Sequence, residues 1–93
     1  MDRELPDSDR ERIKRIIMQN PAVQDLHDLR TRAAGVRSFI QVHIELNPSF
    51  SLMSAHAVAD EVEASLNKAF PNAEVIIHQD PEGYEAVGGL AKS

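Results

Sequence analysis

Cysteine and tryptophan are absent from this chain, and no stretch is long and hydrophobic enough to cross a membrane. The lack of cysteine excludes disulfides, thiolate catalysis and zinc fingers built on cysteine. Residues 1–5 lack the apolar run of a secretory signal. The lysine and arginine residues are interleaved with acidic ones, and the net charge is −5. This argues against nucleic acid as a main partner, because an acidic surface suits cations better. We expect one small domain that does not insert into a membrane, and whose modest core would gain from dimerisation or bound metal.

Two stretches carry the helical spacing of apolar residues. In the first, Ser8 is the expected N-cap and Glu11 completes a capping box, so a helix is predicted from there to about residue 19. Its basic face is better explained as a solvated surface than as a phosphate or lipid site, because acidic residues are interleaved with the basic ones. In the second, Ser51 is the expected cap of a helix that ends at about residue 69, with an apolar stripe beginning at Leu52.

The remaining apolar runs are predicted strands. The clearest of them has Ile40, Val42, Ile44 and Leu46 on one face, and a mostly polar set that includes His43 and Phe39 on the other. Gly35 permits a tight turn that makes this strand a hairpin with the one before it. The strand–helix–strand crossover that follows should be right-handed and should place the last strand parallel to the central one. The expected fold is α+β, of order αββαβ, with two helices on one face of a three-stranded mixed sheet whose strands span residues 23–32, 36–46 and 73–80.

Histidine and aspartate side chains gather on the open, polar face of this predicted sheet. Alternate residues of a strand share a face, so His78 and Asp80 point the same way on the last strand, as His43 does on its neighbour. Strands lie about 4.8 Å apart, which lets these side chains converge on one ion, and His27 can join them from the hairpin partner. Imidazole nitrogen and carboxylate oxygen suit Zn²⁺, with Fe²⁺, Mn²⁺, Co²⁺, Ni²⁺ and Cd²⁺ as rivals. Taken alone, each histidine is more simply explained as a surface or satisfied half-buried residue.

His56 completes the set but lies in the second predicted helix. Four histidines and Asp80 are one ligand too many for a single tetrahedral ion, so two ions bridged by Asp80, with water completing each shell, is the expected count. If that helix packs on the buried sheet face, His56 must come round the sheet edge or across a dimer interface. No nucleophile elbow or oxyanion hole is evident, so we expect a binding domain and not an enzyme. A metal-dependent hydrolase is the least favoured alternative.

Five stretches of the sequence resemble the C-terminal cytoplasmic domain of cation diffusion facilitator transporters, and most of all the bacterial zinc and ferrous-iron efflux branch. They keep the order and spacing of that family over residues 1 to about 81, and the tail takes no part. The stretches are Met-Asp-Arg-Glu-Leu-Pro at 1–6, His-Asp-Leu-Arg-Thr-Arg at 27–32, Phe-Ile-Gln-Val-His-Ile-Glu at 39–45, Ala-His-Ala-Val-Ala-Asp at 55–60 and Ile-Ile-His-Gln-Asp-Pro at 76–81.

The resemblance implies a metallochaperone-like (ferredoxin-like) domain that forms a homodimer below a membrane domain. It assigns two zinc ions per protomer to a binuclear site made by His27, His43, His56, His78 and Asp80, with Gln79 in a supporting position. It also implies that Asp2, in the connection from the last transmembrane helix, pairs with a lysine of the membrane domain. The implied divisions are a linker at residues 1–6, the metal-binding domain at 7–81 and a flexible tail at 82–93.

From this resemblance we expect a metal-sensing, dimerising regulatory domain of a divalent-cation efflux antiporter, at the cytoplasmic face of the inner membrane. The transport residues of the family's membrane domain are not in this sequence, so we expect either an excised domain or a domain-only homologue that cannot transport alone. The competing expectation is a free-standing soluble metal buffer or chaperone, because the binding residues are present without a channel. In either case, histidine ligands must be neutral, so metal binding should weaken as the pH falls through roughly 6.5.

Overall fold

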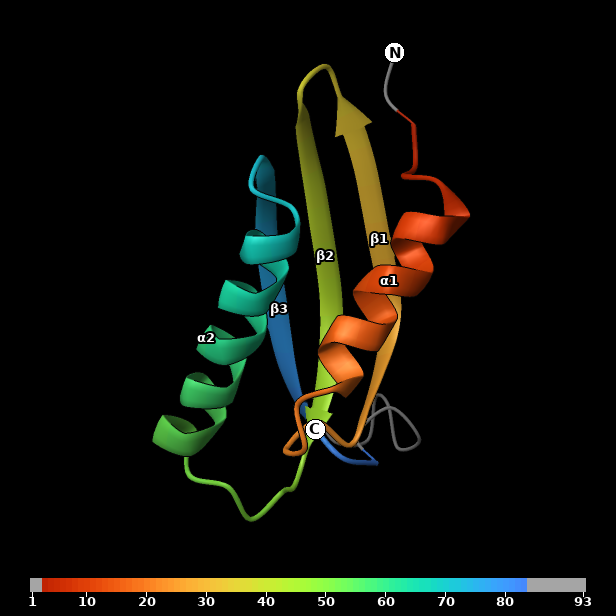
Figure 1. Cartoon of the computed structure of the whole chain (residues 1–93). Helices are drawn as coiled ribbons and strands as arrows, with labels where there is room; N and C mark the ends of the chain where they lie inside the picture. Colours follow the sequence, from red (N-terminus) through yellow and green to blue (C-terminus); the bar gives the residue numbers. More distant parts are fainter. Residues whose placement is uncertain (1–2, 84–93) are drawn as a thin grey trace, which may run out of the picture.

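The computed structural model describes residues 3–83 of the chain and confirms the expected order of two helices and three strands (Figure 1). The middle strand of the sheet is antiparallel to the first strand and parallel to the last. Both helices lie on the same side of the sheet, so its other face is left open (Figure 1). The elements are α1 (Asp7–Met18), β1 (Asp25–Ala34), β2 (Arg37–Leu46), α2 (Leu52–Ala69) and β3 (Ala73–Pro81). The fold is α+β with a mixed three-stranded sheet, as the sequence predicts.

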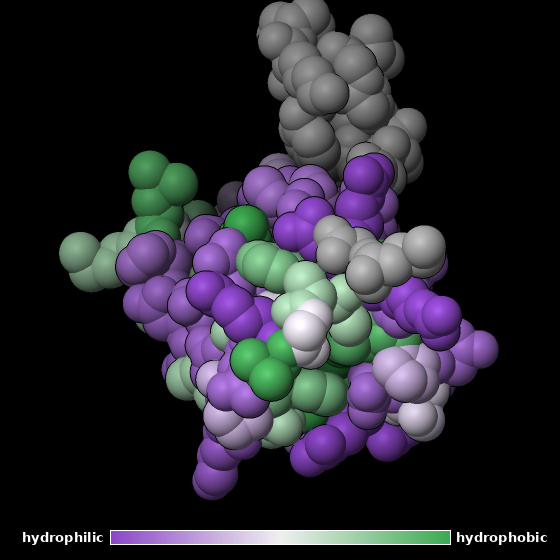
Figure 2. Space-filling model, turned by 90° about the horizontal axis from the view of Figure 1, so that it is seen from above, coloured by the Kyte–Doolittle hydropathy of each residue, from purple (hydrophilic) through white to green (hydrophobic). Residues whose placement is uncertain are grey.

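The hydrophobic core lies between the sheet and the two helices. On β2 every second side chain from Ile40 to Leu46 is buried, and Ile40, Val42 and Ile44 are at most 1% exposed. The helices close this face with apolar side chains at helical spacing, of which Ile17 of α1 and Leu66 of α2 are fully buried. In Figure 2, which looks down on the molecule, hydrophobic residues gather in the middle and hydrophilic residues surround them. Within residues 3–83, neither helix is long and apolar enough to span a membrane.

The two helices begin in different ways. At α2 the prediction is confirmed, because Ser51 Oγ accepts a hydrogen bond from the backbone N–H of Ser54 at 3.0 Å. At α1 the predicted capping box is wrong: Pro6 is the N-cap, Ser8 lies inside the first turn, and no side chain caps the helix. Pro6 itself is extended, with a φ of −55° and a ψ of 152°, and its carbonyl accepts the N–H groups of Asp9 and Arg10 at 3.0 Å, so the first turn begins at Asp7. The predicted apolar stripe of α2 is also wrong at its start, since the first turn lies outside the packed interface and Leu52 is 89% exposed.

The hairpin differs from the prediction at its beginning. The imperfect alternation of the sequence predicted a strand from Val23 on. Val23 is buried, but its N–H donates to the carbonyl of Asn20 at 3.0 Å in the turn that follows α1. The first strand therefore begins two residues later than predicted and also ends two residues later. At the other end of the hairpin, Gly35 takes a φ of +64° in a two-residue turn with Val36, as its freedom at positive φ predicts.

A β-bulge in β1 sets the direction of the side chains on either side of it. Two residues, Asp28 and Leu29, lie between the register positions of His27 and Arg30, where β2 has a single residue. Asp28 takes a φ of +54°, which is uncommon for a residue other than glycine. In an unbroken strand His27 would share a face with Leu29. The extra residue instead places both Leu26 and Leu29 against the core, and leaves His27 on the open face.

The chain that precedes α1 lies along the outer edge of β1. Arg3 and Ala33 exchange two backbone hydrogen bonds, of 3.3 and 2.6 Å. The N–H of Leu5 donates to Oγ1 of Thr31 at 3.1 Å, and the guanidinium of Arg10 donates to the same oxygen at 3.3 Å. Thr31 is buried, and these contacts satisfy its hydroxyl. The described part of the predicted linker is thus paired with the sheet edge.

Candidate metal centre

Three histidines form a row across the open face of the sheet, near the end where β1 begins and where β2 and β3 end. His27 is opposite His43 in the antiparallel register, and His43 is opposite His78 in the parallel register. Their rings stack, with centroids 5.0 Å apart in the first pair and 4.5 Å apart in the second. The bulge in β1 and the strict alternation of β2 are what place the first two rings on the same face.

A row of carboxylates lies beside the histidine row. Asp25 is opposite Glu45, and Glu45 is opposite Asp80. Each carboxylate lies two residues from the histidine of its own strand, so the whole row shares the open face. Imidazole and carboxylate, two of the commonest donors to divalent metals in proteins, therefore run side by side across this end of the sheet.

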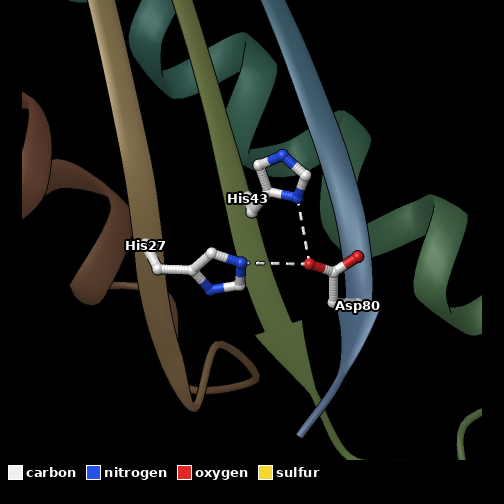
Figure 3. Close-up of side chains that lie close together, drawn as sticks. All are labelled: His27, His43 and Asp80. Carbon is white, nitrogen blue, oxygen red and sulfur yellow. Dashed lines mark hydrogen bonds and ion pairs between the residues drawn. The ribbon is translucent and has the colours of Figure 1, made fainter. Parts of the chain in front are cut away.

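Asp80 lies where its carboxylate meets the rings of two histidines (Figure 3). Its Oδ2 is 3.0 Å from Nδ1 of His43 and 3.2 Å from Nε2 of His27. The side chains of Asp80, His27 and His43 are 17%, 20% and 25% exposed, so they interact with partial shielding from water. One ligand atom from each lies within 4.8 Å of the other two. Three strands thus bring three donors to one point.

The spacing of these donors suits a small divalent ion. Zinc binds imidazole nitrogen and carboxylate oxygen at about 2.0–2.2 Å, which sets the ligand atoms of a tetrahedral site about 3.3 Å apart. The two distances from Asp80 Oδ2, 3.0 and 3.2 Å, are close to that value.

His78 and Gln79 lie beside this group of three. His78 is exposed and stacks against His43, so it extends the histidine row without joining the group of donors within 4.8 Å. The side chain of Gln79 belongs to the opposite face by strand alternation, and it lines a shallow hollow at the beginning of α2. Both residues are near the ion position, and only His78 shares its face of the sheet.

His56 lies apart from the other predicted ligands. It is on α2, which covers the opposite face of the sheet, and its side chain is 72% exposed. Its Nε2 is 3.3 Å from Oδ2 of Asp60, one helical turn further on. Within one chain the described structure brings together His27, His43 and Asp80 and does not bring His56 to them. The remaining predicted contact residue, Asp2, lies outside the described residues.

Two further carboxylates contact the histidines and were not predicted as site residues. Oε2 of Glu45 is 2.9 Å from Nδ1 of His27, and Oδ2 of Asp28 is 3.9 Å from Nε2 of His43. The signal for Glu45 was its position two residues after His43 on a strictly alternating strand. The signal for Asp28 was the three-residue interval between the apolar residues around it, which an unbroken strand does not show.

Asp28 carries its negative charge throughout the neutral pH range. The Nε–H of Arg30 donates to Oδ1 of Asp28 at 3.1 Å. This hydrogen bond is the largest cause that lowers the pKa of Asp28 below its ordinary value of 3.8. Desolvation opposes the shift, and the charges of Arg30, His43 and His27 add to it. A lowered pKa means that the contribution of the charged form to stability is present above the ordinary pKa and is lost as the pH falls below it.

Comparison with known proteins identifies the family. The chain matches the family model described as "Cation efflux protein, cytoplasmic domain" over residues 5–82. The "Cation-efflux pump FieF" of Escherichia coli O1:K1 / APEC is 49% identical over 81 residues, which make up 87% of this chain and 27% of that protein. The FieF of Shigella boydii serotype 18 matches with the same identity and coverage. This chain thus spans 27% of the length of these curated relatives.

Solved structures agree with this result. A structure of CzrB is 37% identical with a TM-score of 0.80, and the match covers 85% of this chain and 99% of that one. The Zn form of CzrB is 38% identical with the same TM-score, over 89% of this chain and 96% of that one. A nickel form of MamM CTD has a TM-score of 0.76 at 19% identity, over 82% of this chain and 98% of that one, and shows likeness of fold alone. The chain belongs to the family of cation efflux protein cytoplasmic domains.

Proposed function

We propose that this chain is the metal-sensing, dimerising regulatory domain of a divalent-cation efflux transporter, with Zn²⁺ as the ion it binds best. The observation that carries the proposal is the convergence of one donor atom each from His27, His43 and Asp80, within 4.8 Å and from three different strands. Two imidazoles and one carboxylate form a donor set that zinc prefers. The Zn form of CzrB, a relative at 38% identity, gives further support.

The charge at this end of the sheet explains why an ion would change the state of the domain. Asp80 and Glu45 are neighbours in the carboxylate row, and Asp28 lies within 3.9 Å of the histidine row. Like charges held close together repel one another, and a divalent cation at their centre replaces the repulsion with attraction. Metal therefore favours the arrangement in which these strand ends are held closest.

A second ion per protomer would be bridged by Asp80. The contacts of this residue with His27 and His43 are made by Oδ2, so Oδ1 is the oxygen that would bind the second ion, with His78 beside it. His56 is on the helix that covers the other face, and it would reach this ion from a second chain. In that arrangement the second ion and the homodimer stabilise each other, because neither is complete without the other.

The transport activity would belong to the rest of a longer protein. The relatives named as cation-efflux pumps are matched over only 27% of their length. We place the chain at the cytoplasmic face of the inner membrane, with residues 1–6 leading from a transmembrane domain that Asp2 contacts, 7–81 as the metal-binding domain and 82–93 as the tail. An ion that binds one state better than another stabilises it by RT ln(1 + [L]/Kd), about 2.7 kcal/mol at a hundredfold excess over Kd.

The proposal is tested by titrating the chain with zinc in a calorimeter and measuring the dimer fraction in parallel by sedimentation velocity. The wild-type chain should bind two ions, and its dimer fraction should rise with zinc. His27→Ala should remove the first binding event, whereas His56→Ala should keep it and lose the second event together with the dimer gain. Glu74→Ala is the matched control, since Glu74 is on β3 and the same face, at the far end from the site. A wild-type chain that binds no zinc, or an unchanged titration for His27→Ala, contradicts the proposal.

A further inference from the structure

Glu45 holds the ring of His27 from the side away from Asp80. Its Oε2 is 2.9 Å from Nδ1 of His27, while Nε2 of the same ring is 3.2 Å from Asp80 Oδ2. The side chains of Glu45 and His27 are 15% and 20% exposed, so this contact is not an incidental surface pair. It follows from the register: Glu45 lies two residues beyond the position opposite His27, on the same face.

This contact selects one form of the imidazole. A charged carboxylate only accepts hydrogen bonds, so Nδ1 of His27 must carry the hydrogen that Glu45 accepts. Nε2 faces the carboxylate of Asp80, and an ion shared with Asp80 would take the place of a proton on Nε2, so that Nε2 gives its lone pair to the metal while Nδ1–H stays with Glu45. A metal ion needs that lone pair, and it also needs the ring held in one orientation about the bond to Cβ. Glu45 meets both requirements.

The geometry points to a specific role for Glu45, and the inference rests on the proposed metal-sensing function. We propose that Glu45 is a positioning residue that fixes the tautomer and orientation of His27, so that Nε2 is presented to the ion shared with Asp80. Metal-binding histidines commonly donate their second nitrogen to a carboxylate in this way, and loss of such a partner typically lowers metal affinity by 10–100-fold. Glu45 does not belong to the group of donors within 4.8 Å of one another, which comprises His27, His43 and Asp80 among the described residues.

The second histidine has a similar but weaker arrangement. Nδ1 of His43 faces Asp80 at 3.0 Å, and its Nε2 faces Asp28 at 3.9 Å. That longer distance is outside hydrogen-bond range, and the Asp28 side chain is 44% exposed and bonded to Arg30. The orienting contact is therefore made at His27, and Glu45 is the residue to change.

The test compares three variants of the chain by zinc affinity and by the ¹⁵N chemical shifts of the His27 ring in the zinc-loaded protein. Glu45→Ala removes the acceptor, and we expect zinc affinity to fall roughly 10–100-fold, with the His27 signals reporting a mixture of zinc-bound nitrogens. Glu45→Gln keeps an acceptor oxygen and should recover most of the affinity and the single Nδ1–H form. Asp25→Ala is the matched control, because Asp25 is opposite Glu45 in the carboxylate row and its Oδ1 accepts the N–H of Leu26.

The outcomes separate this inference from the proposed function. If Glu45→Ala matched Asp25→Ala in affinity and kept a single Nδ1–H form at His27, the positioning role would be overturned while the metal site stood. If Glu45→Gln lost as much affinity as Glu45→Ala, Glu45 would be a direct ligand, which also overturns the positioning role. If the wild-type chain bound no zinc, the proposed function would fail and this inference with it.

Discussion

Replacing Asp80 by alanine should abolish most of the stabilisation that zinc gives to the domain. Oδ2 of Asp80 contacts both His27 and His43, at 3.2 and 3.0 Å. Its loss removes a ligand and the contact that holds the two rings together. Since loss of a ligand's supporting partner costs 10–100-fold in affinity, loss of the ligand itself should cost at least about 100-fold.

The size of the effect follows from binding linkage. At free zinc a hundredfold above the wild-type Kd, one site stabilises the domain by about 2.7 kcal/mol. For a domain of this length, 1 kcal/mol corresponds to about 4–8 °C in Tm, so zinc should raise the wild-type Tm by roughly 10–20 °C. In Asp80→Ala the same zinc concentration is only about equal to Kd. The remaining stabilisation is then about 0.4 kcal/mol, or roughly 2–3 °C.

The assay is thermal unfolding followed by circular dichroism, with and without zinc, for the wild type, Asp80→Ala and Glu74→Ala. Glu74 shares its strand and face with Asp80 but lies at the other end of β3, where it pairs with Arg37 at 3.5 Å on the surface. Glu74→Ala should therefore retain the full zinc-induced rise. If Asp80→Ala also retained it, the assignment of the metal site to this end of the sheet would be refuted.

Three further predictions concern pH, the bulge and the helix caps. Zinc affinity measured by calorimetry should fall steeply as the pH is lowered from 7.5 to 5.5, because an imidazole must be neutral to bind a metal ion and the site uses two of them; a pH-independent affinity would exclude a site built on two histidines. Deletion of Asp28 should leave a folded, zinc-binding domain whose free energy of unfolding, measured in urea titrations, changes by no more than about 1–2 kcal/mol. The reason is that the extra residue has no partner on β2, and its removal keeps His27 on the open face. An unfolded product would show that the faces are wrongly assigned. Ser51→Ala should lower the free energy of unfolding by about 1 kcal/mol in urea titrations, whereas Ser8→Ala should change it little, since only Ser51 caps a helix; equal losses would contradict the cap assignments.

The sequence predicted the fold well wherever hydrophobic periodicity was strict. β2 alternates between apolar and polar side chains from Ile40 on, and its predicted inner residues Ile40, Val42, Ile44 and Leu46 are all buried. From that strand followed the open face, the parallel partner and the neighbourhood of His43 and Asp80. Ser51 was identified because the hydroxyl of a cap has one well-defined partner, the N–H three residues further on.

Prediction was weaker where two local signals competed. Ser8 and Glu11 have the spacing of a capping box, but Pro6 starts the helix first and leaves Ser8 without that role. In β1 the bulge at Asp28 breaks the alternation, so that periodicity alone could not say which face His27 would occupy. The contact of Glu45 with His27 joins two strands, and such diagonal contacts follow from the register of pairing, which a single sequence does not reveal.

His27 and Asp80, which a dashed line connects in Figure 3, come from the two edge strands of the sheet, which are not neighbours. Along the chain His27 and Asp80 are separated by about 50 residues. In the language of polymers, an ion bound to both is a reversible cross-link that closes a long loop, as a disulfide would in a chain that has no cysteine. A permanent cross-link that closed a loop of that length would reduce the entropy of the unfolded chain by an amount equivalent to about 4 kcal/mol, whereas an ion that leaves on unfolding contributes its binding free energy alone. Because the ion would join the two edges of the sheet, its removal by a chelator would loosen the first and the last strand together.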